Sequence, residues 1–185
     1  MKKVLMAATV FLVVFSGCIE KKSESPKTVE TSLEKKAEAT KSPDITEKNF
    51  EKGKNVHGLK MVSLINGETI DFSQFKGKKI MFDFWSSWCE PCIAMFPVIN
   101  KLKTELEDKE GSLKILSISV DPMKGKVKEI VKEKNVLFEV LNAPESLANS
   151  GILMPFTVIA DENGKIIATS SGKHTYEEFL KMLGK

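Results

Sequence analysis

Hydrophobic residues occur along this chain at two different spacings, and the order of these spacings predicts the order of strands and helices. Residues 78–85 and 113–120 are nearly continuous apolar runs, which are typical of strands buried inside a sheet. Residues 93–108 and 123–134 repeat apolar side chains every three or four positions, as amphipathic helices do. The middle of the chain is therefore predicted to be strand, helix, strand, helix, with Pro97 interrupting the first helix.

Shorter segments complete the pattern on both sides. Residues 59–65 and 68–72 alternate in hydropathy around Asn66-Gly67, a pair that favours a hairpin turn. Later in the chain we expect a strand at 136–141, a short helix that ends near 148, a loop at 151–155, strands at 156–160 and 165–170, and a last helix at 175–183. This order predicts an α/β fold in which helices flank a mixed central sheet, with an added N-terminal β-hairpin.

The first 17 residues resemble a secretory signal, because basic residues precede a short apolar run over 4–15. This run is shorter than the roughly 20 residues that a membrane-spanning helix needs. Residues 15–18, Phe-Ser-Gly-Cys, resemble the lipobox of bacterial lipoproteins, although leucine is usual in place of Phe15. We therefore expect an exported protein anchored to a membrane by lipid on Cys18; the alternatives are an uncleaved anchor or an ordinary secretory signal.

The stretch after the leader is rich in Lys, Glu, Ser, Thr and Pro and has hardly any large apolar side chain. Such a segment buries too little surface to offset the entropy that ordering costs. The sequence therefore predicts a flexible tether over 18–54 and a folded domain over 55–185, close to the membrane but free to dock.

Charge argues against a nucleic-acid partner. The formal net charge is only +3, and all 28 basic residues are lysines. Arginine is the better residue for bidentate recognition of phosphates and bases, and it is absent from this sequence. Because the lysines are interleaved with acidic residues, they indicate an ordinary solvated surface.

Cysteine usage indicates redox chemistry. Of the three cysteines, Cys18 lies in the leader, and Cys89 and Cys92 form a Cys-x-x-Cys pair where a buried strand meets a helix. Two cysteines are too few for a zinc site, and His57 and His174 have no ligand spacing, so we expect no metal. The alternative to a redox pair is a permanent structural disulfide.

The position of the pair assigns an order of attack. Cys89 comes where the helix begins, so unpaired backbone N–H groups and the helix dipole favour its thiolate. Cys92 lies one turn into the helix and should be more buried. We expect Cys89 to act as the nucleophile and Cys92 as the resolving thiol, without any other cofactor.

Two segments resemble a known family. Residues 83–92, Asp-Phe-Trp-Ser-Ser-Trp-Cys-Glu-Pro-Cys, resemble the active-site segment of thioredoxins, and residues 154–157, Met-Pro-Phe-Thr, resemble the loop whose proline is cis in that fold. The leader, the added hairpin and the Cys-Glu-Pro-Cys sequence make the chain most similar to membrane-tethered TlpA/ResA-type thiol-disulfide oxidoreductases in the Redoxin superfamily. The similarity covers roughly residues 58–183.

This resemblance implies a thioredoxin fold and an exported, monomeric reductase of disulfides in client proteins. Its clients could include apocytochrome c or copper-site proteins, and a membrane thiol transporter would supply its electrons. The alternatives are a disulfide oxidase or isomerase, or a copper-binding assembly factor that uses Cys89, Cys92 and His174.

Asp83 is the third candidate catalytic residue. An acid inside an apolar strand is costly unless it is paired or useful. The resemblance implies that it relays protons to and from Cys92, with a pKa raised by burial; the alternative is an acid at a frayed strand edge. ResA-type proteins commonly carry a glutamate three residues after the second cysteine, where this chain has Met95. We therefore expect Asp83 to carry out the proton transfer alone.

The resemblance also implies a substrate groove. A cis Pro155 would place the backbone of Met154 opposite Cys89, where an extended client strand could pair with it. An apolar rim would surround the sulfur, made of Trp88, Pro91, Met154 and Phe156, with Gly172 beside the groove.

Glu90 lies between the two cysteines, so its charge should affect the redox potential. A negative charge there opposes the thiolate and destabilises the reduced form. The sign of this effect on the redox potential favours a reductant over an oxidant.

Overall fold

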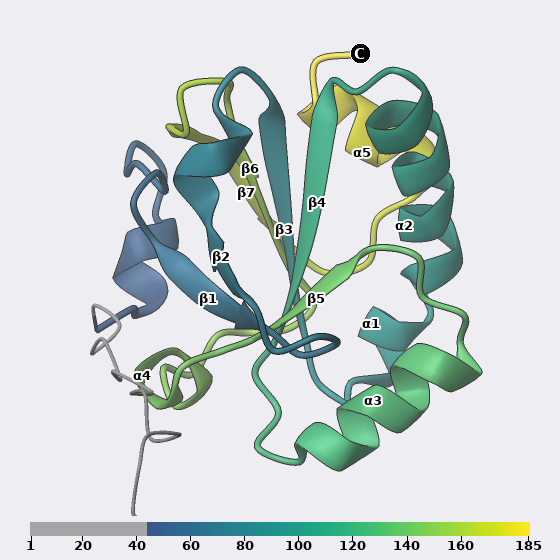
Figure 1. Cartoon of the computed structure of the whole chain (residues 1–185). Helices are drawn as coiled ribbons and strands as arrows, with labels where there is room; N and C mark the ends of the chain where they lie inside the picture. The colour runs from purple at the N-terminus through teal and green to yellow at the C-terminus, as the bar shows by residue number, and fades with distance from the viewer. Residues whose placement is uncertain (1–43) are drawn as a thin grey trace, which may run out of the picture. The chain divides into compact units, whose positions relative to one another are not determined.

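The structure, a computed structural model, describes residues 44–185 (Figure 1). A seven-stranded sheet has the order β2-β1-β5-β4-β3-β6-β7. The elements are η1 (Glu47–Phe50), β1 (Lys60–Ser63), β2 (Thr69–Asp71), η2 (Phe72–Phe75), β3 (Lys79–Trp85), α1 (Glu90–Ile93), α2 (Phe96–Leu102), η3 (Lys103–Lys109), β4 (Leu113–Ser119), α3 (Lys124–Glu133), β5 (Glu139–Asn142), α4 (Glu145–Ala148), β6 (Phe156–Ala160), β7 (Ile166–Ser171) and α5 (Tyr176–Met182).

The sheet is mixed, as the sequence predicts. Strand β4 runs parallel to β3 and to β5, whereas β6 runs antiparallel to both β3 and β7. The predicted N-terminal hairpin is also present, because β1 pairs antiparallel with β2 and joins the sheet through β5. Helices α1, α2, α3 and α5 lie on one side of the sheet, and η1 and α4 lie on the other (Figure 1).

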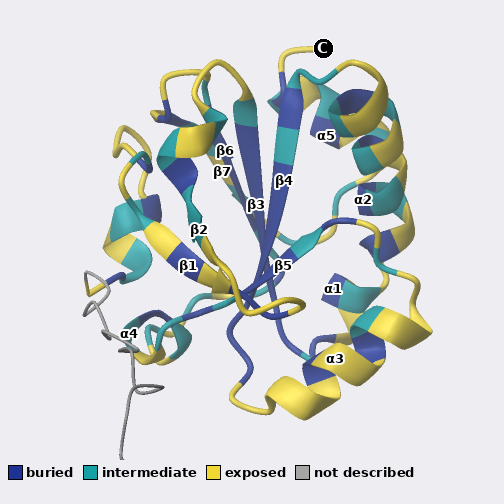
Figure 2. Cartoon of the chain, viewed as in Figure 1, coloured by how far each residue is buried: buried dark blue, intermediate teal, exposed yellow. Residues whose placement is uncertain are grey.

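Strand β3 lies in the middle of the core, because its side chains are buried on both faces of the sheet. Met81 and Trp85 belong to the apolar cluster under α2 and α5. Phe82 and Phe84 belong to a second cluster on the opposite face. Figure 2 shows β3 and β4 buried along most of their length, whereas the outer faces of the helices are exposed. The apolar run that predicts this strand therefore reflects burial on two sides.

The helical segment after the cysteines is divided into pieces. Helix α1 ends at Ile93, and α2 begins at Phe96 with Pro97 in its first turn. Proline is tolerated there because the N–H that it lacks would have no partner inside the helix. Beyond α2, the π-helical η3 completes the connection to β4.

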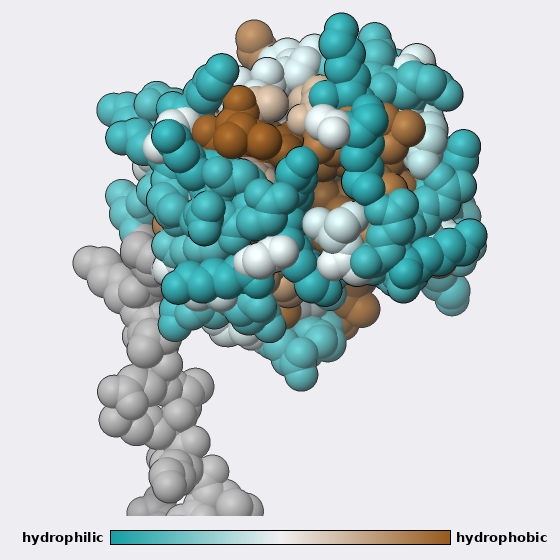
Figure 3. Space-filling view, turned by 90° about the horizontal axis from the view of Figure 1, so that it is seen from above, coloured by the Kyte–Doolittle hydropathy of each residue, from teal (hydrophilic) through white to brown (hydrophobic). Residues whose placement is uncertain are grey.

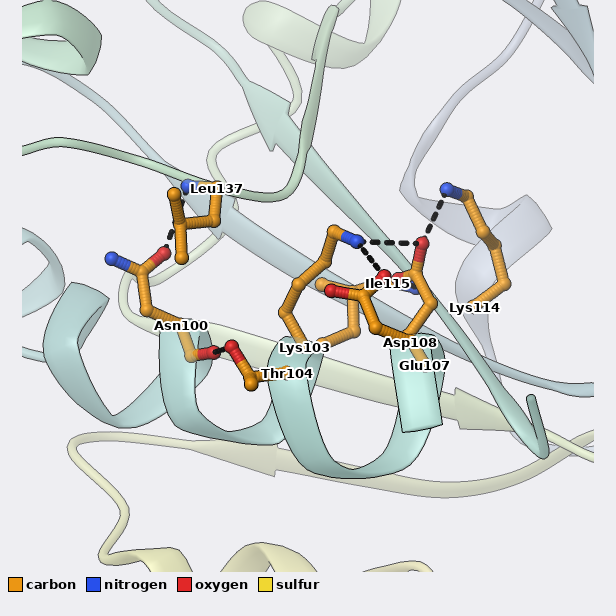
Figure 4. A network of polar contacts seen from close by, with 8 residues as sticks. All are labelled: Asn100, Lys103, Thr104, Glu107, Asp108, Lys114, Ile115 and Leu137. Carbon is orange, nitrogen blue, oxygen red and sulfur yellow. Dashed lines mark hydrogen bonds and ion pairs between the residues drawn. The ribbon is translucent and has the colours of Figure 1, made fainter. Parts of the chain in front are cut away.

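Polar contacts attach this connection to the sheet (Figure 4). Glu107 in η3 accepts hydrogen bonds from the backbone N–H of Ile115 and from the Nζ of Lys114, both at 2.8 Å. Asn100 in α2 accepts a bond from the backbone N–H of Leu137 at 2.9 Å. These bonds fix α2 and η3 against β4 and against the segment before β5.

The structure corrects the predicted boundary between tether and domain. Ile45 and Phe50 are fully buried, and the Phe50 ring lies 5.3 Å from Phe82 and 4.9 Å from Phe84, between centroids. Residues 44–54 therefore belong to the folded domain and not to the tether. The composition of the segment misled the prediction, because only Ile45 and Phe50 in it are buried apolar side chains. Residues 1–43, including the predicted signal and Cys18, lie outside the described part.

Hydrogen bonds hold this N-terminal segment at both ends. Gly53 donates to the carbonyl of Ile166 at 2.9 Å, and Ile166 donates to Lys54 at 2.8 Å. At the other end, the hydroxyl of Ser146 in α4 donates to the carbonyl of Ile45 at 2.8 Å. The segment thus connects β7 to α4 across one face of the sheet.

The end of the molecule seen in Figure 3 lies away from α1. It carries mostly hydrophilic side chains, with hydrophobic ones showing between them. Within residues 44–185, no helix is both long enough and apolar enough to cross a membrane.

Candidate active site

Cys89 and Cys92 lie at the junction between the end of β3 and the first helix, α1. Cys89 occupies the position just before α1, and Cys92 lies inside α1, donating its backbone N–H to the Cys89 carbonyl at 3.0 Å. The two residues form a disulfide, with their Cα atoms 5.3 Å apart. The strand, loop and helix are arranged as the sequence predicts.

The two sulfurs differ in their surroundings. Cys89 is 5% exposed, whereas Cys92 is fully buried, with its Sγ 3.9 Å from the carbonyl oxygen of Phe84. A client can therefore approach Cys89 more easily than Cys92. This difference agrees with the expected order of attack, which stays a prediction.

The loop around Pro155 has the expected backbone. The peptide bond between Met154 and Pro155 is cis. Gly172 donates its N–H to the Pro155 carbonyl at 2.8 Å, so this glycine lies beside the proline loop as expected.

The predicted apolar rim is only partly present. Trp88 is 67% exposed, and Pro91 is exposed in α1. Phe156, however, packs its ring against Phe84 at 5.6 Å, in the cluster on the opposite face of the sheet from the cysteines. Successive side chains of a strand point to opposite faces, so Phe156 at the start of β6 turns away from the disulfide. Its assignment to the rim is wrong.

A cavity of about 580 Å³ adjoins the disulfide loop, and the sequence reasoning missed it. Trp88 and Met154 line one side of it. The other side is lined by the segments that follow β4 and β5, including Val120, Pro122 and Leu147 of α4. Ligands of open α/β sheets often bind outside the carboxyl ends of the strands, where this cavity lies.

Asp83 is fully buried in the middle of β3, so the interpretation as an acid at a frayed edge is wrong. By alternation it faces the same side as Met81 and Trp85, which share a cluster with both cysteines. Neither carboxylate oxygen has a hydrogen-bond partner. Burial raises the pKa of Asp83 well above its usual range, as the sequence predicts, because the charged form is poorly solvated.

Asp121 is a second buried acid near the site, and it was not predicted. It is 3% exposed and accepts hydrogen bonds from the backbone N–H of Ser87 at 2.9 Å and from the Ser87 hydroxyl. It also accepts from the backbone N–H of Met123 at 2.7 Å. Asp121 therefore ties the loop before Cys89 to the loop after β4. An acid directly after a buried strand was the available signal.

Met95 and His174 lie together behind the active-site helix. The backbone N–H of His174 donates to the Met95 sulfur at 3.3 Å, and the imidazole packs against Phe179 with centroids 5.3 Å apart. Within the part of the chain that the structure describes, no three His, Cys, Asp or Glu side chains come close enough to hold a metal ion.

Glu90 is the first residue of α1 and is exposed, between the two cysteines. Its carboxylate lies on the solvent side of the pair, which limits its effect on the sulfurs through screening.

Comparisons with known proteins agree with this arrangement. The family model described as Redoxin matches residues 37–182. The thiol-disulfide oxidoreductase ResA of Bacillus thuringiensis subsp. konkukian is 30% identical over 142 residues, covering 75% of this chain and 80% of the relative.

Solved structures show the same fold. A thiol:disulfide interchange protein of the thioredoxin family from Chlorobium tepidum gives a TM-score of 0.62 at 19% identity, over 72% of this chain and 96% of that one. A DsbF homologue from Corynebacterium diphtheriae gives 0.62 at 18% identity, over 71% and 86%. The chain belongs to the Redoxin family, as a thioredoxin-like thiol-disulfide oxidoreductase of the TlpA/ResA type.

Proposed function

We propose that this protein reduces disulfide bonds in client proteins outside the cytoplasm, through Cys89 and Cys92. One observation carries the proposal: a more accessible Cys89 is bonded to a buried Cys92, at the start of a helix. A pair of this kind can reduce a client disulfide in two steps, because one thiol attacks the client and the second thiol resolves the mixed disulfide.

In the first step, the Cys89 thiolate attacks one sulfur of the client disulfide. A mixed disulfide forms between Cys89 and that sulfur, and the second client sulfur leaves as a thiolate that takes up a proton. Backbone N–H groups at the start of α1 favour the Cys89 thiolate.

In the second step, Cys92 gives its proton to Asp83 and attacks Cys89. The Cys89–Cys92 bond forms, the bond to the client breaks, and the client leaves with two electrons from the pair. Asp83 is suited to accept this proton because burial raises its pKa toward the range of a general base.

The surroundings of the disulfide favour a protein client over a small molecule. An extended client segment would lie against the backbone of Met154, and Trp88 would give it an exposed apolar contact. The adjoining cavity of about 580 Å³ would receive side chains of that segment.

The leader and the family support a proposal for the location and the partners of the protein. We propose a lipid anchor on Cys18 after removal of residues 1–17, a tether shortened to 18–43, and a monomeric domain at the outer face of a bacterial membrane. Electrons would come from a membrane thiol transporter, and clients would include proteins in cytochrome c maturation. The exposed charge of Glu90 supports the direction of electron flow toward the client.

The test is to trap clients in intact cells with Cys92→Ala, which leaves the mixed disulfide at Cys89 unresolved. We expect covalent adducts that a reductant releases. The matched control is Cys89→Ala with Cys92→Ala, which should trap none. Equal adducts in both variants, or none in either, would overturn the proposal.

A further inference from the structure

Unpartnered polar atoms are concentrated beside the active site. Among residues 44–185, eight buried side-chain nitrogen and oxygen atoms have no hydrogen-bond partner in the protein. Four of these belong to three residues: both oxygens of Asp83 and the hydroxyls of Ser117 and Thr157. Buried polar groups without partners are rare in folded proteins, so such a concentration calls for an explanation.

The three residues form one row across the sheet. Asp83 of β3 lies directly opposite Ser117 of β4 and directly opposite Thr157 of β6. Residues that oppose each other on neighbouring strands point to the same face, with Cβ atoms roughly 5 Å apart. All three are fully buried, on the face that α1 covers together with Cys92.

The spacing suits a bridging water. The side chains make no direct hydrogen bonds, although their register places them next to one another on one face of the sheet. A buried water needs two to four polar partners, and this row offers the oxygens of three residues. We propose that Asp83, Ser117 and Thr157 form an internal water-binding site that connects Asp83 to solvent at the edge of the sheet.

The connection runs toward β7. Thr157 lies opposite Ser170, which is partly exposed, and β7 is the last strand of the sheet. In the other direction Ser117 lies opposite the buried, apolar Val140. Hydroxyl groups both donate and accept, so Thr157 and Ser170 can pass a proton along with water. The row of polar side chains therefore reaches solvent at β7, through Ser170.

This route gives the proposed reductase a second exit for protons, and the inference rests on that proposed function. A client bound over Cys89 would cover the direct path from the site to solvent. When Cys92 loses its proton to Asp83 and bonds to Cys89, the departing client thiolate takes a proton from bulk solvent. The proton on Asp83 then leaves through the bound water, Thr157 and Ser170, which restores the carboxylate.

Few other groups could control the ionisation of Asp83. Burial alone raises its pKa, and no charged neighbour within residues 44–185 contributes to the shift. The titratable side chains in the apolar cluster on this face are Cys89, Cys92 and the partly buried Tyr176, and His174 contacts Met95 of the same cluster through its backbone N–H. The water and the two hydroxyls are thus the polar environment of the carboxyl group.

The first test titrates the Asp83 carboxyl carbon by NMR in the oxidised protein without a client. Thr157→Val and Ser117→Ala should each raise the pKa of Asp83 by about one unit, because a donor to the carboxylate is lost. Thr157→Ser keeps the hydroxyl and should restore the wild-type value. Ser171→Ala, at an exposed neighbouring position, should change nothing. Unchanged values in both Thr157→Val and Ser117→Ala would overturn the water site.

The second test measures the route by rapid-quench kinetics on a preformed mixed disulfide. Ser170→Ala should slow its resolution and increase the solvent isotope effect, whereas Ser171→Ala should not. Equal rates and isotope effects in these two variants would overturn the route. If the wild type reduced no client at all, the proposed function would fail while the titration of Asp83 still decided the water site.

Discussion

Ser87 donates two hydrogen bonds to the same carboxylate oxygen of Asp121, one from its backbone N–H and one from its hydroxyl. The pair joins the loop that presents Cys89 to the loop that follows β4. Because Asp121 and Trp88 also line the same cavity, this contact holds together two parts of the cavity wall.

Asp121→Asn should destabilise the protein, because its amide NH₂ would face a donor at Ser87 or at Met123. We expect a loss of about 2 kcal/mol in the free energy of unfolding, since hydrogen bonds to a charged group are the stronger ones. Urea unfolding measures this change. Ser87→Ala, which removes only the hydroxyl, should cost about 1 kcal/mol. A larger loss in Ser87→Ala than in Asp121→Asn would contradict this account.

Asp83 should make the stability fall as pH rises. Its folded pKa lies above the unfolded value of about 3.9, so the folded state binds more protons between the two values. Within that window the free energy of unfolding should decrease by about 1.4 kcal/mol per pH unit from this group. Asp83→Asn should remove this decrease and be more stable than the wild type at high pH.

Urea unfolding of both proteins at a series of pH values checks this effect. Parallel pH profiles for the wild type and Asp83→Asn would show that the carboxyl group is not buried as described. In single-turnover reduction, the same variant should resolve the mixed disulfide about 100-fold more slowly, the lower end of general acid–base contributions.

Glu90→Gln should make the Cys89–Cys92 pair less reducing, because the negative charge that opposes the thiolate is gone. Its exposed position limits the change to on the order of 10 mV, where 30 mV corresponds to about 1.4 kcal/mol for two electrons. Equilibration with glutathione measures the potential. A shift toward more negative values would reverse the assigned role, and a strongly oxidising wild type would argue for an oxidase.

Phe50→Ala should destabilise the domain by about 3–5 kcal/mol, the usual cost of removing a buried aromatic ring. The ring contacts Phe82 and Phe84 on the face of β3 opposite the disulfide. Glu51→Ala, one exposed position further, is the matched control and should leave the urea midpoint unchanged. Similar urea midpoints for Phe50→Ala and Glu51→Ala would contradict the assignment of residues 44–54 to the folded domain.

Local patterns predicted the features that depend on neighbouring residues. The buried run of β3 and the cysteine pair at the start of α1 have signals within a few positions. The cis bond before Pro155 was inferred from the resemblance of residues 154–157 to the thioredoxin loop, and it is confirmed. Strand β5 begins at Glu139, three residues later than predicted, because Asn135 adopts a positive φ of 49° where α3 ends and Val136 still bonds back to Val131.

Features that depend on distant residues were not predictable in this way. Phe50 finds its partners more than thirty positions away, so its isolated apolar side chain gave no periodic signal. The cavity likewise combines Trp88 with the segments after β4 and β5, which only the folded sheet brings together. Phe156 was misplaced because the face it occupies depends on the register of β6 against β3.

The bond from Ser146 to Ile45 has a mechanical consequence. Ser146 belongs to α4, and its neighbour Leu147 forms part of the cavity wall beside Met154. Tension applied to the chain ahead of residue 44 would therefore act first on Ile45 and then on α4. A pull on the N-terminal end of the domain would be transmitted to the wall of the cavity before it reached the disulfide.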